Sequence, residues 1–314
     1  MEELIREGGQ AVLGQNNKKK RKRIKTSKGD AVFMTIVYII MVLSAFLALY
    51  PVYFVLIASV SSANAVSTGQ VWFYPVAFNL EGYKAVLQNE DIVSGYLWTI
   101  LISVGGTFLN LFMTIPTAYI LSRKDFMARN VVLWVFLIPM YFGGGLIPTY
   151  IWMDTIGFNQ NILIMFVPWL VNSYNLIVSR TYFSSSLPSE LFDAAKIDGC
   201  NNVRYFTQIA LPLSKPIVAV IGLYYFVGRW NDWFTPLVYL SGTDVIPLPL
   251  VLRNLLILSD SISGSGGASS GAEVEAALLV KYAVIVVSTL PIMCIYPFVQ
   301  KYFVQGVMLG SVKG

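Results

Sequence analysis

Six long apolar stretches set the main limit on how this chain can fold. A bilayer's hydrocarbon core needs roughly 20 mostly apolar helical residues to cross it, and each stretch is long enough. They predict an all-α, polytopic membrane protein with six transmembrane helices, at about 31–60, 97–121, 131–152, 161–183, 217–240 and 278–298.

Two of these stretches are less regular than the others. Pro139 and the glycines 143–145 interrupt the third stretch, and asparagine and serine residues dilute the fourth. Glycine and proline break helices. A five-span alternative, in which one of these stretches is re-entrant, therefore remains open.

Composition supports a membrane protein and excludes several kinds of site. Of the 314 residues, 56% are hydrophobic and 12% are charged, whereas a soluble domain is about 25% charged. The chain has no histidine, which rules out a Ser-His-Asp triad and a histidine metal site. The two cysteines, Cys200 and Cys294, have no metal-ligand spacing. We expect no metal site and no catalytic residue.

Positive charges collect in alternate loops. The run "NNKKKRKRIKTSK" precedes the first stretch, and further basic residues follow the second, fourth and sixth stretches: Arg123, Lys124, Arg129, Arg180, Lys196, Arg204, Lys215, Lys301 and Lys313. Lysine and arginine are enriched in cytoplasmic loops, so both termini are predicted to be cytoplasmic. We interpret the basic run as an anchor for anionic membrane lipid, neither a nucleic-acid tail nor a cleaved signal peptide.

The spans and loops predict five regions along the chain. A basic cytoplasmic tail (1–30) leads to the first transmembrane helix (31–60) and an extracytoplasmic segment (61–95). A transmembrane core (96–300) contains a cytoplasmic loop at 184–215, here called the polar loop, and a cytoplasmic C-terminal tail (301–314) ends the chain.

The polar loop carries the start and stop signals of two short helices. Ser189 is placed to cap the first helix and Gly199 to end it. Asn201 or Asn202 is placed to cap the second helix, which Pro212 ends. A helix–turn–helix of this kind can lie on the bilayer surface or dock in a partner's groove. The spacing alone leaves both possibilities open.

The order of residues in the polar loop resembles the "EAA" loop of ABC-importer permeases, with aspartate in place of glutamate. The matching positions are Asp193, Ala194, Ala195, Gly199, Ile209, Leu211 and Pro212. The similarity extends over nearly the whole chain, to the carbohydrate-uptake branch (MalG-like, YtcP/LplC-like). It is carried by "FGGGLIPTY" (142–150), "AAKIDG" (194–199), "LPLSKP" (211–216), "GRWNDWF" (228–234) and "QKYFVQGVMLGSVKG" (300–314).

This resemblance implies a fold, a set of partners and a membrane. The fold would be that of a type I ABC-importer permease in the bacterial cytoplasmic membrane. A second, homologous permease would complete a heterodimer, two ATPase subunits would bind the cytoplasmic loops, and a lipid-anchored or periplasmic binding protein would deliver an oligosaccharide. The residues implied to couple to the ATPase are Phe192, Asp193, Ala194, Ala195, Asp198, Gly199, Ile209, Leu211 and Pro212.

Nothing in the sequence predicts nucleotide binding by this chain. It has no GxxxxGK[ST] loop, and the Gly/Ser-rich stretch at 261–272 has no such lysine. We expect no cofactor in this chain and ATP-Mg in partner subunits. A membrane-embedded enzyme has no support, because paired intramembrane carboxylates and nucleophile motifs are missing. An ion-coupled secondary carrier or channel is the alternative, and it leaves the polar loop unexplained.

Polar residues within the spans are candidates for the substrate path. Arg229 and Asp232, three positions apart on one predicted helix, are placed to pair with each other, to line a cavity, or both. Polar groups also join helices to one another in membrane bundles. The candidates are Asn172, Tyr174, Asn175, Arg229, Trp230, Asn231, Asp232 and Trp233.

Overall fold

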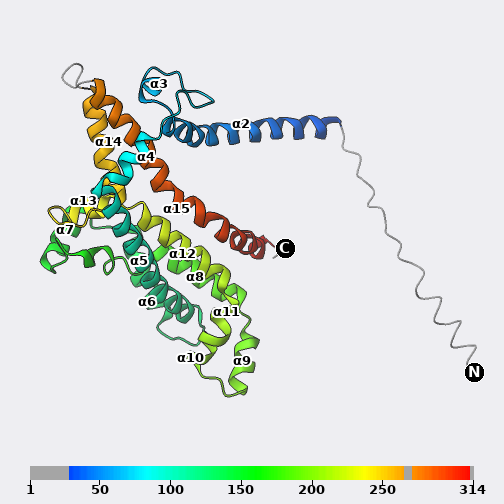
Figure 1. Cartoon of the computed structure of the whole chain (residues 1–314). Coiled ribbons are helices and arrows are strands. Elements are labelled where there is room, and N and C mark those ends of the chain that lie inside the picture. Colours follow the sequence, from blue (N-terminus) through cyan, green and yellow to red (C-terminus); the bar gives the residue numbers. More distant parts are fainter. Residues whose placement is uncertain (1–27, 265–270, 312–314) are drawn as a thin grey trace, which may run out of the picture. The chain divides into compact units, whose positions relative to one another are not determined.

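The computed structural model describes residues 28–264 and 271–311, and these are helices joined by loops and turns (Figure 1). Most of the predicted basic tail (1–30), part of the Gly/Ser-rich stretch and the last three residues lie outside the described residues. The chain divides into one unit that ends at Val52 and another that begins at Tyr53. The sites below belong to the second unit.

Three long helices coincide with predicted spans. They are α2 (Lys28–Ser59), α5 (Glu90–Ser122) and α15 (Gly271–Ser311). In the described part of the chain, these three are long and apolar enough to cross a membrane, and a bent pair adds a fourth candidate. The prediction of a long apolar helix at each of these three places is confirmed, whereas the total of six spans stays a prediction.

The third and fourth predicted spans are not continuous helices. The third is split into α6 (Arg129–Tyr141) and α7 (Leu146–Thr155) by the glycine run, where Gly145 has φ +82°. The fourth consists of a 3-10 turn, η1 (Ile162–Met165), a non-helical stretch at 166–172 and α8 (Ser173–Ser186).

The fifth predicted span, 217–240, is also broken. The helix α12 (Lys215–Trp230) ends at Trp230, and a new helix, α13, begins at Phe234. Asp232 lies outside both helices, and its carboxylate accepts a hydrogen bond of 3.0 Å from the Thr235 backbone N–H in the first turn of α13. The prediction that Arg229 and Asp232 share a helix is therefore wrong.

The remaining helical segments have 17 residues or fewer. They are α3 (Ala63–Ser67), α4 (Glu81–Gln88), α9 (Ser189–Ile197), α10 (Asn202–Tyr205), the π-helix η2 (Phe206–Ala210), α11 (Leu211–Leu213), α13 (Phe234–Tyr239) and α14 (Leu248–Gly264). Helices α5, α8 and α12 lie side by side (Figure 1). Their apolar faces form one core that also takes in the polar loop.

Candidate functional site

The polar loop is a helix–turn–helix, as the sequence predicts. Gly199, at φ +76°, ends α9. The N–H of Gly199 donates to the Lys196 carbonyl, and the N–H of Cys200 donates to the Ala195 carbonyl. This pair of bonds is a Schellman motif, which satisfies carbonyls at the helix end. Asn201 caps α10 by accepting a 2.8 Å bond from the Arg204 N–H.

Two details of the predicted loop are wrong. Ser189 is the first residue of α9 and makes no capping bond, since Pro188 occupies the cap position. Pro212 does not end the second helical segment, because proline is tolerated in the first turn of α11, which continues to Leu213. The chain bends by 80° between the segments 202–213 and 215–230.

Only part of the predicted coupling set is available to a partner. Asp193, Ala194 and Asp198 are exposed, whereas Ala195 is buried and Phe192 is half-buried against the core. Ala195 is thus turned away from any docking surface. Two apolar residues that the predicted set did not include are also available to a partner: Ile197 is 86% exposed and Val203 is 72% exposed. Their positions relative to the buried residues of these helices, Ala195 in α9 and Tyr205 in α10, could have indicated that they are exposed.

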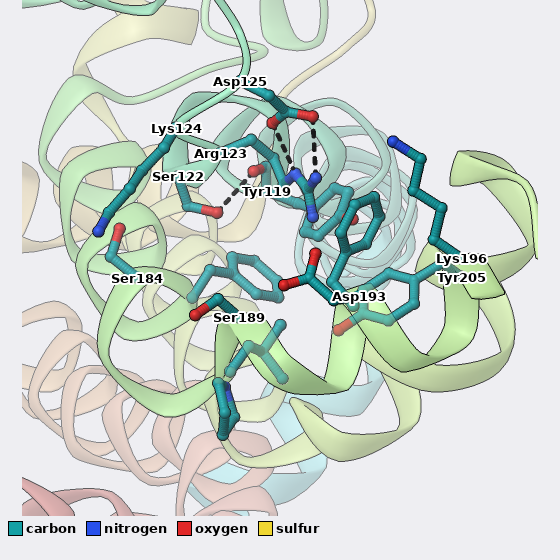
Figure 2. A pocket seen from close by; sticks show the side chains of 14 residues that line it. Tyr119, Ser122, Arg123, Lys124, Asp125, Ser184, Ser189, Asp193, Lys196 and Tyr205 are labelled. Atoms are coloured by element: carbon teal, nitrogen blue, oxygen red, sulfur yellow. Dashed lines mark hydrogen bonds and ion pairs between the residues drawn. The ribbon is translucent and has the colours of Figure 1, made fainter.

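Phe192 faces a cation instead. The guanidinium of Arg123, the residue that follows α5, lies 3.3 Å from the centre of the Phe192 ring. Figure 2 shows the Asp125 carboxylate facing Arg123, whose Nε and one terminal nitrogen each donate to it over 2.9 Å. These hydrogen bonds lower the pKa of the Asp125 carboxyl, although partial burial acts against them. The sequence identifies Arg123 only as one of the basic residues that follow the second apolar stretch, and it does not indicate the contact with Phe192.

Aromatic rings continue this contact into the core. The Phe192 ring meets the Tyr205 ring edge to face at 5.0 Å, and Tyr205 stacks on Tyr119 of α5 at 6.3 Å. A cleft of about 360 Å³ opens beside these groups (Figure 2) and is lined by Tyr119, Ser122, Arg123, Lys124, Asp125, Phe183, Ser184, Leu187, Pro188, Ser189, Phe192, Asp193, Lys196 and Tyr205.

A larger cavity, here called the central cavity, has a volume of about 830 Å³. Its lining consists of Val135, Phe136, Pro139, Met140, Pro168, Trp169, Val171, Asn172, Ser173, Tyr174, Asn175, Tyr224, Tyr225, Gly228, Arg229, Asp232 and Thr235. Five of the predicted path residues are among these. Trp230, Asn231 and Trp233 are not: the Trp230 indole donates to the Ser288 carbonyl, the Asn231 amide donates to the Val227 carbonyl, and the Trp233 ring lies 5.0 Å from the Arg253 guanidinium.

Arg229 has a different partner from the one expected. Its Nε donates to the Asn110 side-chain oxygen over 2.8 Å, and a terminal nitrogen donates to the Met165 carbonyl. Among the described residues no ion pair joins it to Asp232. Gly106 of α5 provides the room, because a β-carbon at this position would lie 2.5 Å from the Arg229 Cδ and Nε.

The non-helical stretch at 166–172 is held by side chains of the neighbouring helices. The Asn110 amide nitrogen donates to the Trp169 and Leu170 carbonyls over 2.6 and 2.8 Å. The Tyr225 hydroxyl accepts from the Asn172 N–H over 2.9 Å. A membrane protein tolerates non-helical backbone where protein groups satisfy it or where it lines a cavity. The 166–172 stretch meets both conditions, since Trp169 and Asn172 also line the central cavity.

Comparison with known proteins places this architecture in a family. Residues 103–309 match the family described as "Binding-protein-dependent transport system inner membrane component". Protein LplC of Bacillus subtilis is 37% identical over 268 residues, which are 85% of this chain and 90% of LplC. The polygalacturonan/rhamnogalacturonan transport system permease protein YtcP of the same species is 33% identical over 285 residues, 91% of this chain and 99% of YtcP.

A solved structure supports the same family assignment. The crystal structure of a bacterial ABC transporter involved in the import of the acidic polysaccharide alginate matches with a TM-score of 0.79 and 29% identity, over 88% of this chain and 99% of the matched chain. The chain therefore belongs to the inner membrane components of binding-protein-dependent transport systems, as a non-catalytic permease subunit of an ABC transporter.

Proposed function

We propose that this chain passes an oligosaccharide through the cytoplasmic membrane, from an extracytoplasmic binding protein to the cytoplasm. Two relatives carry names that refer to polysaccharides: YtcP, to polygalacturonan and rhamnogalacturonan, and the solved transporter, to alginate. The central cavity is the structural observation that supports this proposal. Its amide, phenol and indole groups suit sugar hydroxyls and C–H faces, and Asn172, Tyr174, Asn175, Arg229 and Asp232 are the proposed contacts.

The proposed topology has six spans with both termini in the cytoplasm. The broken pairs α6–α7 and α12–α13, and the segment from η1 through α8, each count as one crossing. Basic residues on alternate loops support this orientation. It places the polar loop and Arg123 on the cytoplasmic side.

The polar loop is the proposed contact with an ATPase. A second homologous permease completes a heterodimer, and two ATPase subunits bind Mg-ATP and hydrolyse it. The exposed residues of the loop, Asp193, Ala194, Asp198 and Gly199, would meet the ATPase surface, with Ile197 and Val203 added from the structure. The inward-facing residues Ala195, Ile209 and Leu211 would hold the loop in shape, while Phe192 contacts Arg123 inside the permease. Pro212 is exposed at the start of the bend.

Replacing Ile197 with glutamate should weaken ATPase binding. Ile197 is apolar and almost fully exposed, and burying a carboxylate in an interface without a partner is costly. We expect at least a tenfold loss of ATPase that co-purifies with the permease in detergent. Ile197→Leu keeps the apolar surface and should retain wild-type yield. Equal yields for the two variants would remove Ile197 from the interface.

Reconstitution tests the proposed function directly. Proteoliposomes are prepared with this chain, its permease partner and the ATPase, and a binding protein loaded with labelled oligosaccharide is added outside. We expect uptake that requires both ATP inside and the binding protein outside. Uptake driven by an ion gradient in the absence of ATP would instead establish a secondary carrier.

A further inference from the structure

The contact between Arg123 and Phe192 joins two elements that the proposed function needs to move together. Phe192 belongs to α9 of the polar loop, and Arg123 directly follows α5. A cation within about 6 Å of an aromatic ring centre is attracted to the ring face. The separation here is 3.3 Å, so the guanidinium lies in close contact with the ring.

Asp125 fixes the orientation of this guanidinium. Two hydrogen bonds of 2.9 Å, to different carboxylate oxygens, hold Arg123 in one plane (Figure 2). The Arg123 side chain is 20% exposed, whereas that of Asp125 is 64% exposed. The exposed Asp125 carboxylate therefore holds the guanidinium from the solvent side, and the less exposed guanidinium contacts Phe192 of α9.

Helix α5 leads from this contact to the central cavity. It remains helical from Glu90 to Ser122, across Pro116. Asn110, which bonds to Arg229 and to the 166–172 backbone, and Gly106, which leaves room for Arg229, lie on the same helix. At 1.5 Å per residue, Asn110 is about 20 Å along the chain from Arg123. A displacement applied to α9 thus has a direct mechanical route to the cavity lining.

We propose that Arg123 is a positioning residue that clamps Phe192, so that movement of α9 is transmitted through α5 to the central cavity. This inference rests on the proposed function, because it takes an ATPase as the source of the movement. The clamp acts from inside the permease and is separate from the exposed face of α9. Its loss should leave ATPase docking intact and reduce the transport obtained for each ATP hydrolysed.

The experiment measures ATP hydrolysis and sugar uptake in the same proteoliposomes. In Phe192→Leu and Arg123→Gln we expect the number of ATP molecules hydrolysed per sugar imported to rise at least fivefold. Phe192→Trp keeps an aromatic face and should remain within twofold of wild type. Lys124→Gln removes a neighbouring cation of the same cleft and is the matched control, with wild-type coupling.

Co-purification of the ATPase separates the clamp from general damage. We expect wild-type amounts of bound ATPase in all four variants. If Arg123→Gln and Phe192→Leu lower hydrolysis and uptake in equal proportion, the contact is merely structural and the clamp is wrong. If both variants couple as wild type does, the clamp is also wrong. ATP-independent uptake by the wild-type complex would instead overturn the proposed function, and the clamp with it.

Discussion

Gly106→Ala is expected to lower sugar uptake at least tenfold, although it adds only one methyl group. The new β-carbon would lie 2.5 Å from Cδ and Nε of Arg229, closer than non-bonded atoms approach. Arg229 cannot swing aside without losing its bonds to Asn110 and the Met165 carbonyl. Overpacking costs about 1–3 kcal/mol, and each buried polar group left unpaired costs a further ~1–3 kcal/mol.

The neighbouring Gly105 provides the control for this prediction. A β-carbon at this position would meet only the Phe166 ring at 3.5 Å, an ordinary contact. Both substitutions replace glycine with alanine inside α5, so any gain in helix propensity is similar. Gly105→Ala should transport as wild type does. Uptake and thermal unfolding of the purified complex are measured for both variants. Equal results would show that transport does not depend on the close packing of Arg229 against Gly106.

The long helices and the polar loop could be predicted because their signals are local. Apolar length identifies α2, α5 and α15 as candidate membrane spans, and Gly199 and Asn201 mark the turn and the second cap. The asparagine and serine residues of the fourth predicted span indicate an irregular segment, but no local signal shows what satisfies the backbone of the non-helical stretch at 166–172. Its backbone is satisfied by Asn110, whose partners Trp169 and Leu170 are 59 and 60 residues away. No window of sequence contains both sides of that bond.

The same reason explains the error at Arg229. The i, i+3 rule favoured Asp232, but that carboxylate accepts a hydrogen bond from the Thr235 N–H of α13, and the arginine bonds to Asn110, 119 residues earlier. Phe192 was likewise assigned to an outer groove because the sequence does not show that Arg123 comes to lie over its ring. Charge counting predicts that Arg123 lies on the cytoplasmic side, but it cannot identify the ring that Arg123 contacts. Tertiary contacts decide these roles.

Gly199→Val is expected to abolish ATP-driven uptake. Gly199 has φ +76°, and a left-handed conformation costs about 1–2 kcal/mol for residues other than glycine, with β-branched residues disfavoured most. A β-carbon at this position meets no atom within 4 Å, so we attribute the expected effect to backbone strain. A backbone change that relieves this strain would break the two Schellman hydrogen bonds and change the direction of α9. Asparagine tolerates this conformation, so Gly199→Asn should retain most uptake.

Gly157→Val is the matched control for backbone strain. Gly157 has φ +82°, with no atom within 4 Å of a β-carbon, but it follows α7 and lies outside the polar loop. The two valine variants should therefore lose similar thermal stability. We expect only Gly199→Val to lose the co-purifying ATPase, by tenfold or more. If Gly157→Val releases the ATPase equally, general destabilisation explains the loss, and the turn at Gly199 has no special part in coupling.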